Sequence, residues 1–154
     1  MKTVLVEKMP SPTHWVPLSE EEARHATTVL RLRKGDQIRV IDGLGHQGVA
    51  FLDKIGAPGV VKLSEKDPVL HRSVQDDHLP INLVCALLKG DAMDWVIEKA
   101  VELGVQRVRP LLTDHGVVKV ENKGPTAFQQ RLQKIADQSL KQCERLYRMP
   151  VDAP

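Results

Sequence analysis

Aromatic side chains are scarce in this chain of 154 residues, which has two Phe, two Trp and one Tyr, or 3% of its length. Any core must therefore be built from aliphatic side chains, which make up most of the 42% hydrophobic fraction. Cysteine is rarer still: the chain has two, Cys85 and Cys143, which lie far apart in the sequence. A disulfide framework is not expected, and the predicted location is a reducing cytoplasm.

Long apolar runs are missing too. No stretch approaches the about 20 residues of a membrane-spanning helix, and residues 1–8 lack the apolar core of a signal peptide. The six histidines show neither HxxxH nor HxH spacing, so no metal site is predicted. A net charge of +2 is too weak to indicate nucleic acid by itself. These absences leave a soluble globular protein of one medium or two small domains.

The clearest pattern lies in residues 81–112. A short apolar run at 83–88 predicts a strand buried on both faces, as in a parallel sheet. Asp91 can cap the helix that follows, and Gly104 is placed to end it. The apolar face of this helix is marked by Met93, Val96, Ile97, Ala100 and Leu103. With a second strand at 105–112, the pattern is a βαβ unit, which implies parallel pairing.

The first half reads as short strands joined by turns. Alternating or β-branched runs predict strands at 3–6, 37–42, 49–55 and 60–65. Ser19 followed by three glutamates has the form of a capping box, and a short helix is expected to run to about Leu30. The pattern predicts a small β-barrel crossed by one helix.

Residues 43–48 spell G-x-G-x-x-G, the string found in dinucleotide-binding folds. That site needs a helix to begin at the glycines, so that its N-terminus meets the pyrophosphate. Residues 49–55 have only the length of a strand. A glycine-rich hairpin is therefore the prediction here, with the dinucleotide site as the alternative.

A polar, acidic segment closed by proline, residues 73–80, marks the predicted domain boundary. A second helix is predicted over 126–146, and residues 149–151 can begin a third strand. The buried face of this second helix is marked by Phe128, Leu132, Ile135, Ala136, Ser139, Cys143 and Leu146. Its basic surroundings come from Arg131, Lys134, Lys141, Arg145 and Arg148. Two βα units are too few strands for an open sheet, so the sequence is expected to stop inside a domain.

Several strings share an order with a known family: HATTVLRLRKGD at 25–36, VIDG at 40–43, LKGD at 88–91, MDWVIEKAVELG at 93–104, PLLT at 110–113, VVK at 117–119, LQKIA at 132–136 and QC at 142–143. With them the chain resembles the bacterial small-subunit ribosomal RNA uridine-N3 methyltransferases, the RsmE family. The resemblance implies an α+β fold of two domains. These are a PUA-like β-barrel for RNA binding at 1–74, a linker at 75–80, and an incomplete α/β SPOUT domain, the knotted methyltransferase fold, at 81–154.

The resemblance also implies S-adenosylmethionine as the methyl donor, small-subunit ribosomal RNA or the assembled subunit as partner, and a homodimer at full length. This chain departs from the family pattern at Asp114-His115, where relatives have Glu-Arg, and at 141–145. Family members continue past the position of Pro154. Their continuation carries the knot and most of the cofactor pocket, so cofactor-binding residues are expected beyond Pro154.

Candidate site residues follow from chemistry and resemblance together. His115 and Lys119 come after the second strand, at the carboxyl end where α/β sheets place ligands, so they are candidate catalytic residues. The alternative for His115 is a solvated loop histidine. The RNA-binding candidates are His25, Arg31, Arg33, Lys34, Gln142 and Arg145, with an exposed turn and a solvated helix face as the alternatives. The functional hypotheses are an RNA-methylating enzyme and a stand-alone RNA-binding module.

Overall fold

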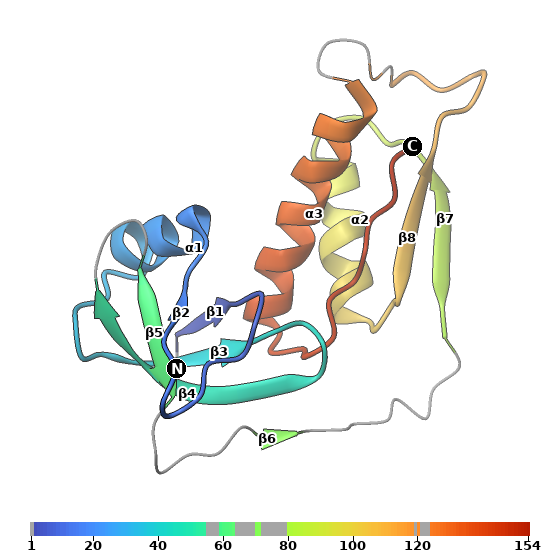
Figure 1. The fold of residues 1–154 in the computed structure, drawn as a ribbon. Coiled ribbons are helices and arrows are strands. Elements are labelled where there is room, and N and C mark those ends of the chain that lie inside the picture. The colour runs from blue at the N-terminus through green and yellow to red at the C-terminus, as the bar shows by residue number, and fades with distance from the viewer. Residues whose placement is uncertain (1, 55–58, 64–69, 72–79, 119, 121–123) are drawn as a thin grey trace. The chain divides into compact units, whose positions relative to one another are not determined.

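The computed structural model describes residues 2–54, 59–63, 70–71, 80–118, 120 and 124–154. The chain divides into two compact units, an N-terminal unit, Met1–Gln75, and a C-terminal unit, Asp76–Pro154. Figure 1 shows the elements of each. In the part of the chain that the structure describes, no helix is both long enough and apolar enough to cross a membrane.

The N-terminal unit is a curled mixed sheet, as the predicted barrel requires. Its strands are β1 (Thr3–Leu5), β2 (Val16–Pro17), β3 (Gln37–Ile41), β4 (His46–Lys54), β5 (Val60–Leu63) and β6 (Leu70–His71). They pair in the order β1-β3-β4-β5-β2, with β6 added to β4. The β1–β3 pair is parallel and the others are antiparallel. The strand order closes part of a barrel and leaves β1 at one edge.

The predicted helix crosses this sheet as α1 (Glu20–Arg24) and the π-helical turn η1 (His25–Val29). Ser19 caps it, since its Oγ accepts a hydrogen bond of 3.2 Å from the backbone N of Glu22. The carboxylate of the buried Glu22 accepts from the backbone N of Leu5 at 3.2 Å, which ties the helix to β1. The Ser19 cap of the predicted capping box is thus present, and the Glu22 carboxylate of that box makes a tertiary contact with β1.

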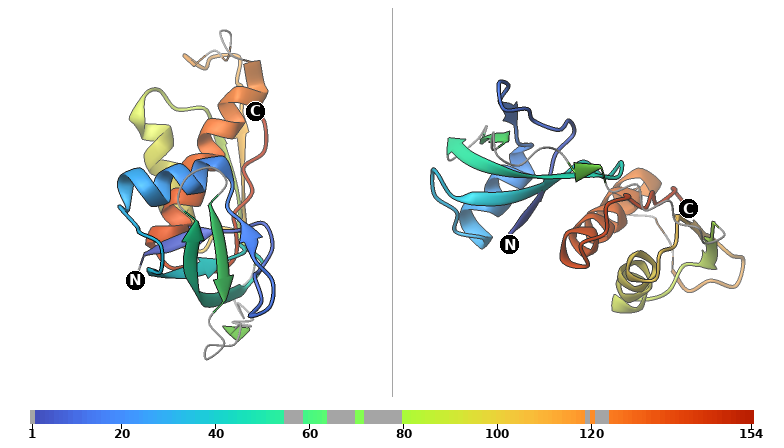
Figure 2. Two further views of the ribbon diagram at one scale, coloured as in Figure 1. Left: turned by 60° about the vertical axis from the view of Figure 1, so that its left-hand side comes forward. Right: turned by 90° about the horizontal axis from the view of Figure 1, so that it is seen from below.

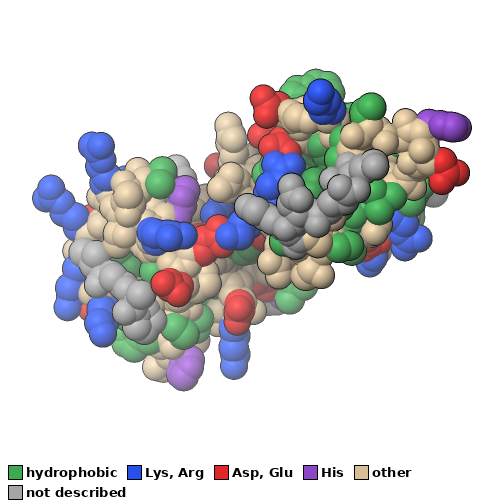
Figure 3. Space-filling model, turned by 90° about the horizontal axis from the view of Figure 1, so that it is seen from above, with side chains coloured by type: hydrophobic (Ala, Val, Ile, Leu, Met, Phe, Trp, Pro, Cys, Tyr) green, Lys and Arg blue, Asp and Glu red, His purple; other side chains and the backbone are tan. Residues whose placement is uncertain are grey.

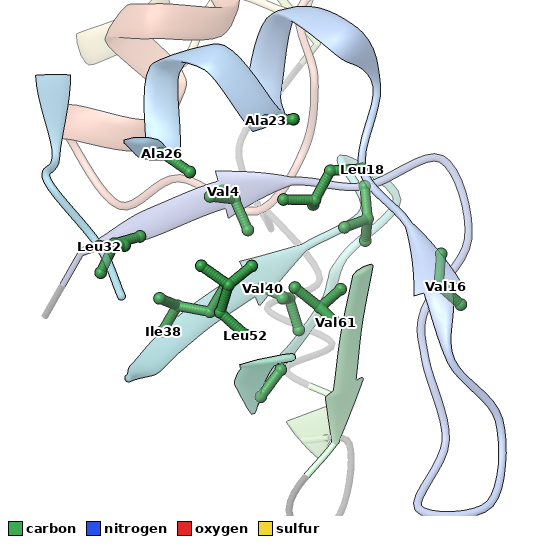
Figure 4. Packing of buried hydrophobic residues seen from close by; sticks show 12 residues of the cluster. Val4, Val16, Leu18, Ala23, Ala26, Leu32, Ile38, Val40, Leu52 and Val61 are labelled. Carbon is green, nitrogen blue, oxygen red and sulfur yellow. The ribbon is translucent and has the colours of Figure 1, made fainter. Parts of the chain in front are cut away.

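An aliphatic core lies between the helix and the sheet (Figure 4). Its members are wholly aliphatic: Val4, Val6, Val16, Leu18, Ala23, Ala26, Leu32, Ile38, Val40, Ala50, Leu52 and Val61. Alternate residues of β3 and β4 point into this core, which leaves the residues between them on the outer face of the sheet. The prediction of a core without aromatic residues is confirmed for this unit.

The G-x-G-x-x-G string forms a hairpin between β3 and β4, as predicted. Asp42 organises the turn: its Oδ1 accepts from the backbone N of Leu44 at 2.8 Å and of His46 at 3.1 Å. Its Oδ2 lies 2.5 Å from His46 Nδ1. The glycines therefore close a turn, and β4 begins at the position where a dinucleotide site would need a helix.

The C-terminal unit contains the predicted βαβ unit as β7 (Asn82–Ala86), α2 (Asp91–Glu102) and β8 (Arg107–Leu111). The strands are parallel, with Cys85 opposite Pro110 in the register. Helix α3 (Gly124–Gln142) packs beside α2, and both helices lie on one face of the sheet (Figure 2). Both helices begin at the end where β7 and β8 end (Figure 1).

Gly104 ends α2 as predicted, in a left-handed conformation with φ of 87°. Its backbone N donates to the carbonyl of Val101 at 3.2 Å, and that of Val105 donates to Ala100 at 2.9 Å, which is a Schellman motif. Two details of α2 differ from the prediction. The N-cap is Gly90, with Asp91 as the first helical residue, and Leu103 is 78% exposed because it lies past the last turn.

The prediction that the apolar run of β7 is buried on both faces is wrong for the described chain. Leu83 and Cys85 are half-buried, while Val84 is 56% exposed. Among the described residues β7 pairs with β8 alone, and the helices cover one face of the sheet. Partial burial raises the pKa of the Cys85 thiol, and both cysteines are free.

Where residues 149–151 were predicted to begin a third strand, Val151 forms an isolated parallel bridge with Val108 of β8. Two glutamine side chains of α3 hold this segment by hydrogen bonds to its backbone. Gln133 accepts from the backbone N of Val151 at 2.9 Å and donates to the carbonyl of Met149 at 3.1 Å. Gln129 donates to the carbonyl of Val151 at 2.9 Å. Of the seven residues predicted for the buried face of this helix, four are buried: Leu132, Ala136, Ser139 and Leu146. The helix ends at Gln142 rather than at 146, Cys143 is exposed, and Leu140, which was not predicted, is buried.

Candidate functional site

A basic turn, residues 31–34, joins the end of η1 to β3. Arg31, Arg33 and Lys34 are exposed, while Leu32 between them is buried in the core. Arg31 holds a positive φ of 52°, an uncommon conformation for a residue other than glycine. Three exposed cations therefore flank a leucine that anchors the turn in the core.

The backbone of the basic turn is fixed by hydrogen bonds that do not use the cationic groups. Leu32 N donates to the carbonyl of Ala26 at 2.9 Å, and Arg33 N to Asp36 Oδ2 at 2.7 Å. Gly35 N donates to the carbonyl of Leu52 at 2.7 Å. The guanidinium groups are therefore presented by a rigid backbone. Lys34 Nζ lies 3.1 Å from Asp53 Oδ1, an exposed ion pair.

Lys2 adds a cation that sequence reasoning missed, because its ammonium donates to the carbonyl of Leu30, the residue before the basic turn. The two residues are 28 positions apart, so the contact depends on the packing of the helix against β1 and not on local sequence. His25 is half-buried at the first position of η1. In the view of Figure 3, Lys and Arg side chains project from the margin of the N-terminal unit.

The carboxyl edge of β7 and β8 is the second candidate site. Leu87 N donates to the carbonyl of Leu111 at 3.0 Å, which continues the pairing to the edge. His115 lies just beyond it in a tight turn, where Gly116 N donates to the carbonyl of Thr113 at 2.9 Å. A Cβ on Gly116 would lie 2.9 Å from Thr113 Oγ1 and 3.1 Å from the Thr113 carbonyl oxygen, so a larger residue there would require the turn to shift.

His115 and the residues before it, 111–114, are exposed to solvent. Lys119, the other catalytic candidate, lies outside the described residues. Among the described residues no group of three or more His, Cys, Asp or Glu side chains is arranged to hold a metal ion. S-adenosylmethionine needs an enclosed site that shields its sulfonium group and orients the methyl carbon. The exposed edge formed by these residues does not build such a site by itself.

Arg145, a candidate for RNA binding, lies against the end of α2. Its Nη1 donates to the carbonyls of Val101 at 3.2 Å and Val105 at 2.8 Å, and its Nη2 donates to that of Gly104 at 3.0 Å. A guanidinium there gives the Val101 carbonyl a second donor besides Gly104 N, binds the carbonyls of Gly104 and Val105 just after the helix, and complements the negative end of the helix dipole. This geometry favours a structural role, and the RNA-binding role stays a prediction.

Gln142 is the last residue of α3 and is exposed. Arg148, nearby, forms a two-pronged contact with Asp137, with N–O distances of 2.7 and 2.6 Å. Hydrogen bonds to Asp137 raise the pKa of Arg148, against the opposing effect of partial burial. The structure therefore groups the predicted residues into an N-terminal set around the basic turn and a C-terminal set, and within the C-terminal set Arg145 is turned toward α2.

Comparison with protein families matches both units in chain order. An RNA methyltransferase PUA domain matches residues 18–63, and an RNA methyltransferase domain matches residues 75–154. The second match covers slightly more than half of the chain and includes β7, α2, β8 and α3.

Curated relatives and solved structures agree with these matches. The chain is 34% identical over 143 residues to the ribosomal RNA small subunit methyltransferase E of Synechocystis, covering 90% of this chain and 43% of that protein. The corresponding Bacillus subtilis protein is 30% identical over 130 residues, covering 83% and 49%. The chain thus spans about half the length of these curated relatives.

Among solved structures, the ribosomal RNA small subunit methyltransferase E of Neisseria gonorrhoeae bound to S-adenosylmethionine has a TM-score of 0.81 at 26% identity, covering 99% of this chain and 62% of that one. A methyltransferase of Legionella pneumophila with bound S-adenosylmethionine shares the fold, with a TM-score of 0.87 at 24% identity and the same coverage. The expected PUA-like and SPOUT folds are confirmed by these neighbours, and the chain belongs to the RNA methyltransferase family that includes the ribosomal RNA small subunit methyltransferases E.

Proposed function

We propose that the whole protein transfers a methyl group from S-adenosylmethionine to N3 of a uridine in small-subunit ribosomal RNA, in the cytoplasm. In this proposal the N-terminal unit binds RNA, and the C-terminal unit supplies the first part of the methyltransferase domain. Full-length homodimerisation belongs to the same proposal. Support comes from the relatives, which are small-subunit ribosomal RNA methyltransferases, and from the solved neighbours that hold the cofactor.

One observation carries the proposal from the structure. Residues 82–111 form a parallel strand–helix–strand unit with a further parallel bridge at Val151, in the part of the chain that matches the RNA methyltransferase model. In such sheets the loops after the strands form the ligand-binding edge. Here those loops are 87–90 and 112–118, and the second contains His115.

The chemistry of uridine N3 defines what a complete site must do. N3 lies on the pairing edge of the base, so the base must be unpaired or flipped out before it can react. The N3 proton must be removed, or the negative charge that develops on O2 and O4 must be stabilised. An imidazole and an ammonium group suit these roles, so His115 and Lys119 stay the proposed pair for this chain.

The second candidate function is a stand-alone RNA-binding module. The exposed carboxyl edge favours it for the chain as given, since an exposed imidazole in a solvated turn lacks the enclosure that methyl transfer needs. The two functions differ in one feature. The enzyme requires a cofactor site and the module does not.

Methyl transfer tests the proposal directly. The whole protein, incubated with tritiated S-adenosylmethionine and small subunits that lack the modification, is expected to label the ribosomal RNA. A methyl group on N3 blocks pairing, so reverse transcription of the labelled RNA should stop next to one uridine. Absence of label on RNA that the protein binds would favour the binding module.

For the chain of 154 residues alone, we expect weak or undetectable binding of S-adenosylmethionine, because its described carboxyl edge is exposed. Isothermal calorimetry with this chain and the cofactor measures this. The whole protein serves as the positive control. Micromolar affinity for the chain alone would contradict the expectation and show that residues 1–154 already form the cofactor site.

A further inference from the structure

The outer face of the N-terminal sheet carries a row of side chains that runs across its strands. The antiparallel register places Val16 of β2 opposite Val61 of β5. Trp15, one residue before Val16, is therefore opposite Lys62, one residue after Val61. Lys62 is in turn paired with Phe51 of β4, and Phe51 with Gln37 of β3. We call Trp15, Lys62, Phe51 and Gln37 the outer row. It contains two of the five aromatic residues of the chain.

Trp15 is held in place at the end of this row. A tight turn precedes it, in which Ser11 and His14 exchange backbone hydrogen bonds of 3.3 and 3.2 Å. The ammonium of Lys62 lies 5.5 Å from the centroid of the Trp15 ring, a cation–π contact. The indole is nevertheless 41% exposed, while its neighbour Val16 is buried in the core. A rigid and partly exposed indole beside a cation is thus presented to solvent.

The outer row is continuous with the basic turn. Asp53 lies two residues after Phe51 on β4, at the point where the pairing of β4 with β5 shifts register, and it is half-buried. Lys34 of the basic turn reaches Asp53 with its Nζ 3.1 Å from Oδ1. One end of the surface therefore offers an aromatic ring with a lysine, and the other end offers Arg31, Arg33 and Lys34.

We propose that the outer row binds an unpaired segment of RNA, with one base stacked on Trp15 and the phosphates of the same strand leading toward the basic turn. The proposal rests on the proposed RNA-binding role of the N-terminal unit and names the form of RNA that it takes. An aromatic face stacks on any exposed base, whereas bases inside a duplex already stack on each other. Lys62 orients the indole by its cation–π contact, and the same ammonium contacts a neighbouring phosphate in this proposal.

Tryptophan fluorescence tests this, because Trp15 and Trp95 are the two tryptophans and lie in different units. In the Trp95→Phe variant of the full chain, a ten-nucleotide single-stranded RNA of mixed sequence is expected to quench the remaining emission saturably. A blunt duplex of the same sequence should quench it far less. The matched Trp15→Phe variant, which keeps Trp95, should show little quenching by either RNA.

Affinity measurements separate stacking from charge. Trp15→Ala is expected to bind the single strand about 5- to 150-fold more weakly, the range for removing one base–aromatic stack, with an unchanged salt slope. Trp15→Phe keeps a ring and should retain most of the affinity. Lys62→Gln should lower the salt slope by about 0.7, the value for one phosphate contact on a single strand.

Unchanged emission at RNA concentrations that saturate the chain, or equal affinity of Trp15→Ala and the parent chain, would overturn the proposal. Salt-dependent binding through the basic turn would then still support the RNA-binding role of the unit. If neither the single strand nor the duplex binds the chain, both the outer-row proposal and the RNA-binding role fail.

Discussion

Replacing Arg145 with alanine is expected to destabilise the C-terminal unit by about 2–4 kcal/mol, because the substitution takes a charged hydrogen-bond donor away from three backbone carbonyls at once. These carbonyls belong to Val101, Gly104 and Val105, where α2 ends and the chain turns into β8. The positive charge also complements the negative end of the α2 dipole. The guanidinium fork therefore fixes the corner between the helix and the strand.

Urea unfolding followed by Trp95 emission measures this effect, since Trp95 lies on α2. The measurement is made in a Trp15→Phe background, so that the signal comes from the C-terminal unit alone. A decrease of about 2–4 kcal/mol in the free energy of unfolding corresponds to a midpoint lower by roughly 1–2 M urea, for a slope of about 2 kcal/mol/M. Arg145→Lys keeps the charge but cannot reach three carbonyls in a fixed fork, so it should restore only part of the stability.

Arg148→Ala is the matched control. It removes the same charge three residues away, where Arg148 forms a two-pronged ion pair with Asp137 at the surface. Surface ion pairs typically contribute about 0.2–1 kcal/mol, so a smaller loss is expected than for Arg145→Ala. If Arg145→Ala unfolds at the same urea concentration as the parent but binds RNA more weakly, the structural role is wrong and the RNA-binding role is supported.

The case of Arg145 shows that a sequence pattern can locate a basic residue without revealing whether its guanidinium binds RNA or the protein's own backbone. The sequence places several basic residues around 141–148, and a basic helix end favours phosphate binding when nothing else is known. Whether a given guanidinium points to solvent depends here on hydrogen bonds to the end of α2, which lies 40 to 44 residues earlier in the chain. Nothing in the residues next to Arg145 encodes that contact.

Short-range patterns were more reliable. The glycine cap at Gly104 and the hairpin at 43–48 are set by residues within a few positions, and the parallel β7-α2-β8 unit follows from three local elements joined by short loops; the structure confirms all three. The burial of β7 was predicted wrongly, because an apolar run reports what a strand can bury and not how many of its faces are covered. The outer row was missed for a related reason, since Trp15, Lys62 and Phe51 become neighbours only through strand pairing.

Changing Arg31, Arg33 and Lys34 together to alanine is expected to weaken RNA binding by about 100-fold at about 0.1 M salt, because three phosphate-binding cations are removed. Each phosphate contact on a single strand contributes about 0.7 to the slope of log affinity against log salt. Removing three of these cations lowers the slope by about 2, so the affinities of variant and parent should converge toward about 1 M salt. Titration of a labelled single-stranded RNA at several salt concentrations measures both quantities.

The triple variant should keep its fold, because the hydrogen bonds that shape the basic turn come from the backbone of Leu32, Arg33 and Gly35 and from the Asp36 carboxylate. A control that removes three lysines elsewhere, Lys8, Lys99 and Lys134, matches the change in net charge. If that control lowers the slope as much, the effect is one of overall charge. If the triple alanine variant keeps the parent affinity and slope, the basic turn is not part of the RNA interface. If affinity and slope fall in the triple alanine variant but not in the control, the phosphate contacts belong to the three cations of the basic turn. That outcome is expected, because the buried Leu32 between these cations fixes the backbone that carries them.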